Sequence, residues 1–203
     1  LWAVGEADYG QLGDNTNASK SSPVQIGSET TWSSIDTSKQ NSYAKKTDGT
    51  FWVWGGNNDA GGLGLNNTTK YSSPVQLPGT TWKAGKGAGT ENVAVVKTDG
   101  TLWTWGEGYL GSLAHNSQTD YSSPVQVPGT TWSSFGITWK SNGIFALKTD
   151  NTLWAWGDNE DGNLGLNAPE ASAKSSPTQI PGTRWTNVYA SSRSVIAQQT
   201  LEE

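Results

Sequence analysis

The sequence of 203 residues has no cysteine, no methionine and a single histidine. Without cysteine there are no disulfide bonds, no thiolate metal ligands and no thiol nucleophile. Charged residues make up only 15% of the chain. No apolar run approaches the roughly 20 residues of a membrane-spanning helix. These absences exclude a disulfide-stapled scaffold and a thiol enzyme, and we expect no membrane insertion.

The charge balance is acidic, with a formal net charge of -5 and a pI near 4.9. A protein with net negative charge is not drawn to nucleic-acid phosphates or anionic lipid in general, so we expect no nucleic-acid partner. The chain begins at Leu1, contains no methionine and shows no basic and apolar leader ahead of that residue. We therefore expect it to be processed or excised from a longer protein.

Tryptophan and glycine are abundant, with 12 and 25 copies, and the tryptophans follow a repeat. The stretch LWAWG at 153–157 recurs as LWTWG at 102–106, FWVWG at 51–55 and LWAVG at 1–5. The closing glycines stand at positions 5, 55, 106 and 157, and a fixed period of this length is typical of propellers, solenoids and other arrays. We predict a single repeat domain over residues 1–203, with units at approximately 1–50, 51–101, 102–152 and 153–203.

Each period carries the signals of four short strands. A loop rich in Gly, Asn and Asp follows the Trp-Gly element, and then comes a Ser-Ser-Pro segment whose proline cannot donate to a central ladder, so we place that strand at the outer edge. A tryptophan opens the next strand. An Asp-Gly or Asp-Asn pair then joins two strands in a hairpin, for which we expect a type I′ turn. The prediction is an all-β fold of four-stranded antiparallel blades, which is a β-propeller.

The two ends of the chain fall within that hairpin. Residues 1–5 correspond to its second strand and residues 195–200 to its first. Pairing of these N- and C-terminal strands would close a ring of four blades and remove two sheet edges. The same arrangement also fits a four-repeat part of a longer ring, or half of an eight-blade ring made by two chains. A homo-oligomer is therefore one of the expected states.

The motifs K-T-D-G-T-L-W-x-W-G, N-x-x-G-x-L-G and S-S-P-V-Q with a spaced Trp resemble the RCC1 (regulator of chromosome condensation) repeat. The likeness is to the Trp-rich form found in bacterial and phage-encoded proteins, and it covers all four units. It implies a β-propeller that binds proteins, and the best known members of the family have seven blades. The histidine of the family's Ala-Gly-x-x-His-Thr segment is absent from all four units, and contact residues of its GTPase exchange factors do not map onto this chain.

The segments between the first and second strands of the units vary in length and chemistry, whereas the strands keep the repeat. Because recognition usually falls on variable loops of a rigid scaffold, we predict a binding rim at one end of the central channel, with Trp139 as an exposed anchor. The alternative is that these segments are ordinary surface loops. The predicted rim consists of Lys39, Gln40, Asn41, Lys86, Glu91, Asn92, Trp139, Lys140, Asn142 and Arg193.

The Trp-x-Trp pairs alternate with the period of a strand, which sends one indole to each face of a sheet. Because both faces of a propeller blade pack on neighbouring blades, we predict that these tryptophans form the structural core. The alternative is that some of them stack on a sugar ligand, as in lectin-like propellers. The predicted core set is Trp2, Trp52, Trp54, Trp103, Trp105, Trp154 and Trp156.

No set of catalytic residues stands out in the sequence. The acidic loops lack the ligand spacing and the terminal Glu of a calcium-binding EF-hand loop. His115 aligns with Asp14, Leu65 and Leu166 of the other units and is interpreted as a surface substitution. There is no Ser, His and acid constellation and no phosphate-binding loop. We expect a protein that is not an enzyme and that has no metal and no cofactor.

The leading hypothesis is a non-catalytic recognition module that binds a protein or another surface ligand through one loop face. A first alternative is a structural subunit of a larger assembly such as a virion or an appendage. A second alternative is a lectin-like propeller that binds a glycan. For each hypothesis we favour a secreted, cell-surface or virion-associated protein over a cytoplasmic one.

Overall fold

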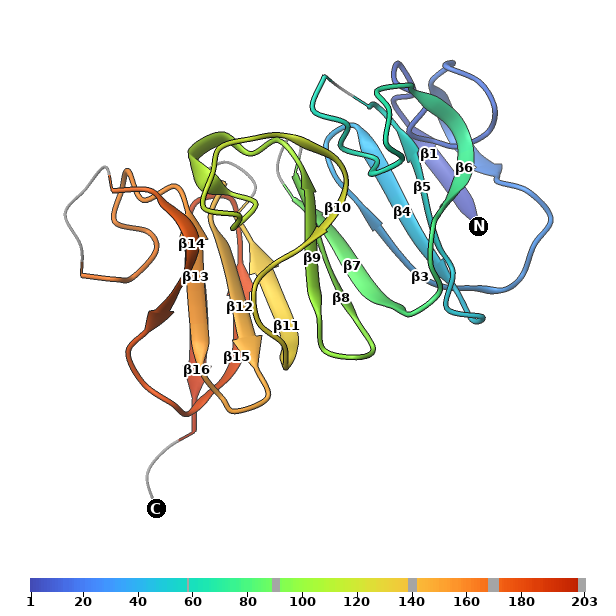
Figure 1. Cartoon of the computed structure of the whole chain (residues 1–203). Helices are drawn as coiled ribbons and strands as arrows, with labels where there is room; N and C mark the ends of the chain where they lie inside the picture. The colour runs from blue at the N-terminus through green and yellow to red at the C-terminus, as the bar shows by residue number, and fades with distance from the viewer. Residues whose placement is uncertain (58, 89–91, 139–141, 168–171, 201–203) are drawn as a thin grey trace.

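The computed structural model describes residues 1–57, 59–88, 92–138, 142–167 and 172–200, which form an all-β structure with one short 3-10 turn. The sheets stand side by side along an open arc (Figure 1). Three sheets have four strands, and a two-stranded sheet lies at each end of the arc. We call these sheets blades and half-blades. Among the described residues, none of the helical segments has the length and apolar character needed to cross a membrane.

The strand bounds follow the repeat. The N-terminal half-blade contains β1 (Trp2–Gly5) and β2 (Lys20–Gln25). The first blade contains β3 (Trp32–Thr37), β4 (Asn41–Lys46), β5 (Phe51–Gly55) and β6 (Tyr71–Leu77). The second contains β7 (Trp82–Ala88), β8 (Asn92–Lys97), β9 (Leu102–Gly106), the turn η1 (Tyr109–Gly111) and β10 (Tyr121–Gln126). The third contains β11 (Trp132–Ile137), β12 (Ile144–Lys148), β13 (Leu153–Gly157) and β14 (Lys174–Ile180). The C-terminal half-blade contains β15 (Trp185–Ala190) and β16 (Val195–Gln199).

Every blade pairs its strands in sequence order, and all pairs are antiparallel. The Ser-Ser-Pro strands β6, β10 and β14 lie at one edge of their sheets, as predicted from the proline that each contains. Each blade takes two strands from one sequence unit and two from the next. The N-terminal half-blade therefore corresponds to the last two strands of a blade, β1 and β2. The C-terminal half-blade corresponds to the first two, β15 and β16.

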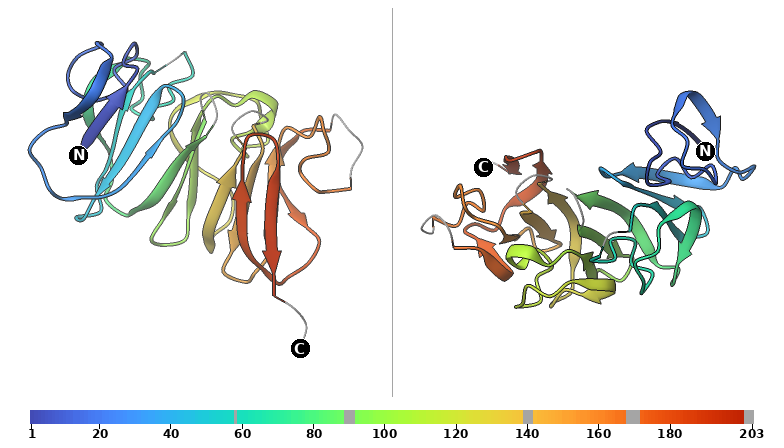
Figure 2. Two further views of the ribbon diagram at one scale, coloured as in Figure 1. Left: turned by 180° about the vertical axis from the view of Figure 1, so that it is seen from behind. Right: turned by 90° about the horizontal axis from the view of Figure 1, so that it is seen from above.

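The first strand of each blade lies on the concave side of the arc (Figure 2). We call β3, β7, β11 and β15 the inner strands. Successive inner strands contact one another, so that together they form one continuous wall. This wall corresponds to the lining of the central channel of a closed propeller.

The apolar core is divided into layers between adjacent sheets. Phe51 and Val53 of the first blade pack with Trp82 and Trp105 of the second in one buried cluster. Similar clusters join the second blade to the third, and the third blade to the C-terminal half-blade. The second and third blades are therefore each packed against a neighbour on both faces, as in other repeat architectures.

The predicted closure by the two terminal strands is not formed in this structure. Among the described strands, β1 pairs with β2 alone and β16 pairs with β15 alone. The two strands lie at opposite ends of the arc (Figure 2). The physical reason is the thickness of the layers between sheets, because bulky side chains such as Trp105 and Trp132 hold neighbouring sheets apart and four units turn through only part of a ring.

The hairpin turns between β4 and β5 differ from the predicted type I′ geometry. The N–H of Gly49 bonds to the carbonyl of Lys46 at 3.0 Å, and positive φ falls on Gly49 (85°) after the turn. This is a type I turn followed by a left-handed residue. The cause is local: Asp48 Oδ1 accepts hydrogen bonds from the N–H and hydroxyl of Thr50, which holds the aspartate within the turn. Gly100 and Asn151 take the same positive φ in the next two hairpins.

The second tryptophans of the Trp-x-Trp pairs are buried, namely Trp54, Trp105 and Trp156. The first tryptophans are half-buried, and each lies under a lysine ammonium group, as Trp103 lies 4.0 Å from Lys97 Nζ. Trp2 is a correction to the predicted core, because 62% of its surface is exposed. Its half-blade lacks the two strands that would otherwise cover the indole.

Candidate recognition surface

A hollow with a volume of about 610 Å³ lies on the concave wall. All four inner strands contribute to it, as do the neighbouring strands β4 and β8. Its lining combines apolar side chains, such as Ile35 and Phe135, with the hydroxyl groups of Ser34 and Ser133. A concave surface of this mixed character suits the docking of a ligand.

Two lysines in the hollow have ammonium groups available for a ligand. Lys45 on β4 and Lys83 on β7 both line it, and neither makes an ion pair within the described part of the chain. Lys45 stands where the next two blades carry Val96 and Leu147. Lys83 stands where the third blade carries Ser133. The wall is therefore different in each blade, although the framework behind it repeats.

The repeated framework behind the wall includes a chain of hydrogen bonds in the hairpin of each blade. Asp99 Oδ1 accepts a 2.7 Å bond from the Thr101 hydroxyl, and Thr101 Oγ1 accepts a 2.8 Å bond from Trp103 Nε1. The hydrogen bond from the Thr101 hydroxyl, followed by that from the Thr101 N–H, lowers the pKa of Asp99. The same chain of hydrogen bonds runs through Asp48, Thr50 and Trp52, and through Asp150, Thr152 and Trp154. The Thr-Asp-Gly-Thr motif thus serves the scaffold.

Only some of the residues of the predicted binding rim lie in the turns between the first and second strands, where we expected them. The turns between first and second strands gather at one end of the sheets, the upper end in Figure 1. Lys39 and Arg193 are exposed there, and Gln40 and Asn142 are half-buried. Lys86 lies on β7 opposite Ala94. The predicted residues outside the described ranges are Glu91, Trp139 and Lys140.

Asn41 and Asn92 are corrections to the predicted rim. Their exposed fractions are only 4% and 2%. Each begins its strand and pairs with a closing glycine, Asn41 with Gly55 and Asn92 with Gly106. The ladder therefore extends through both asparagines and draws them into the blade instead of leaving them in the loop.

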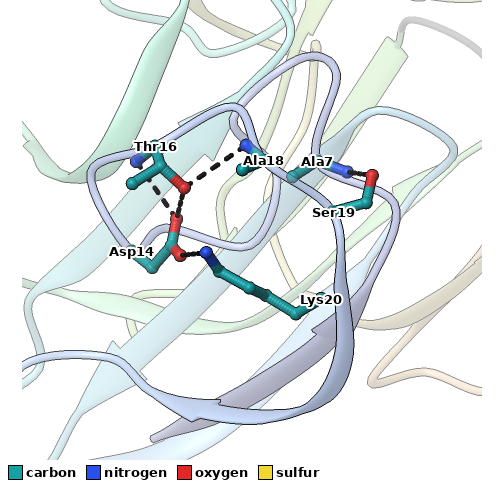
Figure 3. A network of polar contacts seen from close by, with 6 residues as sticks. All are labelled: Ala7, Asp14, Thr16, Ala18, Ser19 and Lys20. Carbon is teal, nitrogen blue, oxygen red and sulfur yellow. Dashed lines mark hydrogen bonds and ion pairs between the residues drawn. The ribbon is translucent and has the colours of Figure 1, made fainter.

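The Gly, Asn and Asp rich loops are held by internal polar contacts. In the first of them, Asp14 forms a 3.2 Å ion pair with Lys20 and accepts a 2.7 Å hydrogen bond from the Thr16 hydroxyl (Figure 3). Ala7 N–H donates to Ser19 Oγ across the base of the loop (Figure 3). The hydrogen bond from Thr16, with a further contribution from Lys20, lowers the pKa of Asp14. These contacts are scaffold contacts.

His115 occupies the position of Asp14 in another of these loops, and it is half-buried rather than a plain surface residue. Its ring packs edge-on against Tyr121, with the ring centres 5.2 Å apart. The Thr104 hydroxyl donates to the Leu113 carbonyl at 2.7 Å, so the 3.0 Å contact of Thr104 with His115 Nε2 requires Nε2–H as donor. Burial lowers the pKa of the imidazole. In the described part of the chain, no cluster of three or more His, Cys, Asp or Glu residues could hold a metal ion.

Sequence reasoning missed the concave wall, because it placed recognition in the turns beside the inner strands rather than on them. A signal was present. The inner strands WSSIDT, WSSFGI and WTNVYA keep their tryptophan and differ at the hollow-lining position held by Ile35, Phe135 and Val188, although Ser34 and Ser134 are alike.

The fold and its repeated contacts define the chain as a β-propeller protein of four-stranded blades. Residues 99–135 and 150–198 match the model of the regulator of chromosome condensation (RCC1) repeat. These two segments are accordingly RCC1-like repeats.

Three solved structures share this fold at low sequence identity. Human WBSCR16 has a TM-score of 0.79 at 20% identity over 98% of this chain and 53% of its own. Prp20p from Saccharomyces cerevisiae, described with its binding properties to Gsp1p and histones, has a TM-score of 0.79 at 18% identity over 100% of this chain and 52% of its own. Yeast RCC1 (Prp20) in a complex with Kap60 has a TM-score of 0.71 at 16% identity, over 91% and 45%. The chain thus spans about half the length of these proteins.

Proposed function

We propose that this chain is a non-catalytic recognition module that binds another protein through its concave wall and the adjoining upper turns. The observation that carries the proposal is the contrast between a framework that repeats from blade to blade and a hollow whose lining differs in each blade. Folding alone does not require the lining to differ between blades, whereas recognition by surface residues on a rigid scaffold does. The similar protein Prp20p, which has described binding properties to Gsp1p and histones, lends support.

Among the described residues, the hollow is lined by two lysines and one aspartate, Asp36, so its net positive charge favours a partner segment that carries carboxylates. Lys45 and Lys83 offer two ammonium groups beside the apolar surface of Ile35 and Phe135. An acidic side chain placed there would gain charge-assisted hydrogen bonds from the two ammonium groups. The surrounding serine hydroxyls can donate or accept, which suits a peptide backbone.

A protein partner is favoured over a glycan by the positions of the indoles. Among the described tryptophans, Trp2 alone is largely exposed, and it lies on β1, away from the hollow. The others are buried or half-buried against the framework. Stacking on a sugar ring would need an exposed aromatic face in the site.

The test is photo-cross-linking in an extract of the source organism. A photoreactive phenylalanine analogue replaces Lys83 in the hollow, Lys39 in the upper turns, or Gln126 on the edge strand β10 as the matched exposed control. The proposal expects the same partner to be captured from Lys83 and Lys39 and not from Gln126. Capture from Gln126 alone would instead support a structural subunit that assembles through its outer strands.

The captured partner is then purified and titrated against charge variants. Lys45→Glu with Lys83→Glu should weaken its binding at least about tenfold, because two attractive contacts become repulsive. Lys39→Glu should change the affinity less, since that side chain lies at the exposed margin. Unchanged affinity in the double variant, with an intact fold by circular dichroism, would contradict the proposed site.

A further inference from the structure

The junctions between successive sheets are closed toward the concave wall by a pair of apolar side chains. Between the second and third blades, Phe135 of β11 packs against the buried cluster that contains Val96 of β8. Between the third blade and the C-terminal half-blade, Val188 of β15 packs against the cluster that contains Leu147 of β12. Each pair joins an inner strand to the second strand of the preceding blade.

The junction between the first and second blades has other residues at these two positions. The strand pairings place Lys45 of β4 at the position of Val96. They also place Gly85 of β7 at the position of Phe135. Because glycine has no side chain, no group at position 85 covers the lysine, which lines the hollow. We call the part of the hollow beside Gly85 and Lys45 the recess.

A third departure from the repeat lies two residues earlier in β7. In three of the four inner strands, a hydroxyl at the position after the tryptophan donates to a carbonyl of the second strand. These bonds run from Ser33 to Lys45 and from Ser133 to Leu147 at 3.1 Å, and from Thr186 to Gln198 at 3.2 Å. Lys83 stands at this position in β7 and has no hydroxyl. The second blade therefore carries an exposed ammonium group where the other sheets have a scaffold hydrogen bond.

The three departures meet at one junction. A lysine can lay its stem along apolar surface and reach water with its ammonium group, which accounts for Lys45 alone. It does not account for a glycine and a second lysine in the adjacent strand. At a further equivalent position, Gln198 Oε1 accepts a 3.0 Å hydrogen bond from Asn187, so that polar side chain has a partner in the chain. The ammonium group of Lys45 has none within the described ranges. Local departures that bring no gain in packing or hydrogen bonding are typical of functional sites.

We propose that the recess is the anchor pocket of the recognition surface and takes one carboxylate side chain of the partner protein. This inference rests on the proposed function and specifies the part of the hollow that selects the partner segment. The carboxylate enters beside Gly85 and contacts the ammonium groups of Lys45 and Lys83. An apolar residue next to it in the partner contacts Phe135, which lines the hollow on the far side of β7.

Charge complementarity favours an acidic occupant. Among the described residues that line the hollow, Asp36 is the sole carboxylate, and its Oδ1 accepts a 2.9 Å hydrogen bond from the N–H of Thr37. The two lysines make the hollow locally positive, although the chain has a formal net charge of -5. A positive site on an acidic surface attracts an anionic group to one place and repels it elsewhere. Because Lys45 is half-buried, its attraction for a carboxylate is less screened than in bulk water.

The equivalent strands supply substitutions that the fold already accommodates. Gly85→Val copies Val188 and fills the recess without changing its charge. Lys45→Gln copies Gln198 and removes one charge without filling the recess. Circular dichroism and urea unfolding of each variant establish that its fold is intact.

Two further variants complete the set. Lys83→Ser copies Ser133 and restores the scaffold hydroxyl while removing the second charge. Lys70→Gln is the matched control for charge, because Lys70 is an exposed lysine ahead of the edge strand β6 and is not among the residues that line the hollow. Lys45→Gln with Lys83→Ser tests the pocket without any added side chain, so the experiment does not depend on the folding of Gly85→Val.

The probe is a synthetic library of short, blocked peptides with randomised side chains, passed over the immobilised full chain. The retained peptides should be enriched in aspartate or glutamate at least about threefold over the library, as expected for one partly solvated ion pair. Gly85→Val and the double lysine variant should lose this enrichment, and Lys70→Gln should keep it.

Retained peptides without acidic enrichment, or no retained peptides, would overturn the anchor pocket. Enrichment that persists in a folded Gly85→Val chain would overturn it as well. Either result leaves the proposed function standing if cross-linking from Lys83 and Lys39 captures one partner. Capture from Gln126 alone would contradict the proposed function itself, so the two failures are distinguishable.

Discussion

Trp105 donates its indole N–H to the carbonyl of Gly62, 3.1 Å away and 43 residues earlier in the chain. This bond crosses from one blade to the loop of the preceding unit, and the indole itself is completely buried. It combines apolar packing with satisfaction of a buried carbonyl. The second tryptophan of the repeat is thus the main connection between blades, and its loss should be costly.

Trp105→Phe should lower the free energy of unfolding by about 2–4 kcal/mol, because it leaves a small cavity and an unpaired carbonyl. Trp103→Phe is the matched control, since that indole is half-buried and donates to Thr101 within its own hairpin. We expect the control to cost about half as much or less. Urea denaturation of both variants at one pH measures the difference, and equal losses would contradict the role given to the inter-blade bond.

Gly64→Ala and Gly165→Ala form a second matched pair. Both glycines have positive φ, so each substitution carries the cost of about 1 kcal/mol for a left-handed residue. Only at Gly64 would the new methyl group collide with Trp105, at 2.8 Å from Nε1. We expect Gly64→Ala to cost at least about 2 kcal/mol more in thermal or urea unfolding than Gly165→Ala. Similar costs would show that the loop can move away from the indole.

Lys97→Gln tests the contribution of the lysines that lie over the tryptophans. The ammonium group of Lys97 lies 4.4 Å from the ring of Trp82 and 4.0 Å from the ring of Trp103. Glutamine stands at the equivalent position 199, so the substitution fits the fold. We expect a loss of about 1 kcal/mol, which is typical of a partly buried cation–π contact. Lys39→Gln, at an exposed position, should change the unfolding free energy by no more than about 0.5 kcal/mol.

His115 should make stability depend on pH below neutrality. Burial lowers the pKa of the folded-state imidazole, so the unfolded chain binds the proton more readily. The stability is therefore fully present above the ordinary histidine pKa of about 6.5 and is lost as the pH falls through the window below it. His115→Leu, which copies Leu65 of another unit, should remove this dependence between pH 7 and pH 5. An unchanged pH profile in that variant would contradict the assignment.

Much of the architecture followed from the sequence because its signals are local. The proline of each Ser-Ser-Pro segment placed β6, β10 and β14 at sheet edges, and the structure confirms this. The period of the tryptophans indicated a repeat array, and the resemblance of its motifs to the RCC1 repeat agrees with the matched segments at 99–135 and 150–198. Such features depend on hydrogen-bonding capacity and side-chain alternation, which each residue carries with it.

The errors arose where contacts between distant residues decide the outcome. Asn41 and Asn92 look like loop residues in sequence, but the ladder with Gly55 and Gly106 extends through them. The Asp-Gly hairpins have type I turns instead of the predicted type I′ turns, because the Asp48 carboxylate accepts hydrogen bonds from the Thr50 N–H and hydroxyl. The hollow around Lys45 and Lys83 exists only because four inner strands from different units lie side by side.

The repeat, the strands and the interlocking of units can be read from the residues in order, since these features depend on short-range spacing and on the residues that can pair at an edge. How far four units turn depends on contacts between sheets. The packing of indoles and apolar side chains between sheets sets the angle from one blade to the next, and that angle leaves β1 and β16 apart with Trp2 and Ile196 uncovered. Ring closure depends on the sum of those angles, which no single repeat encodes.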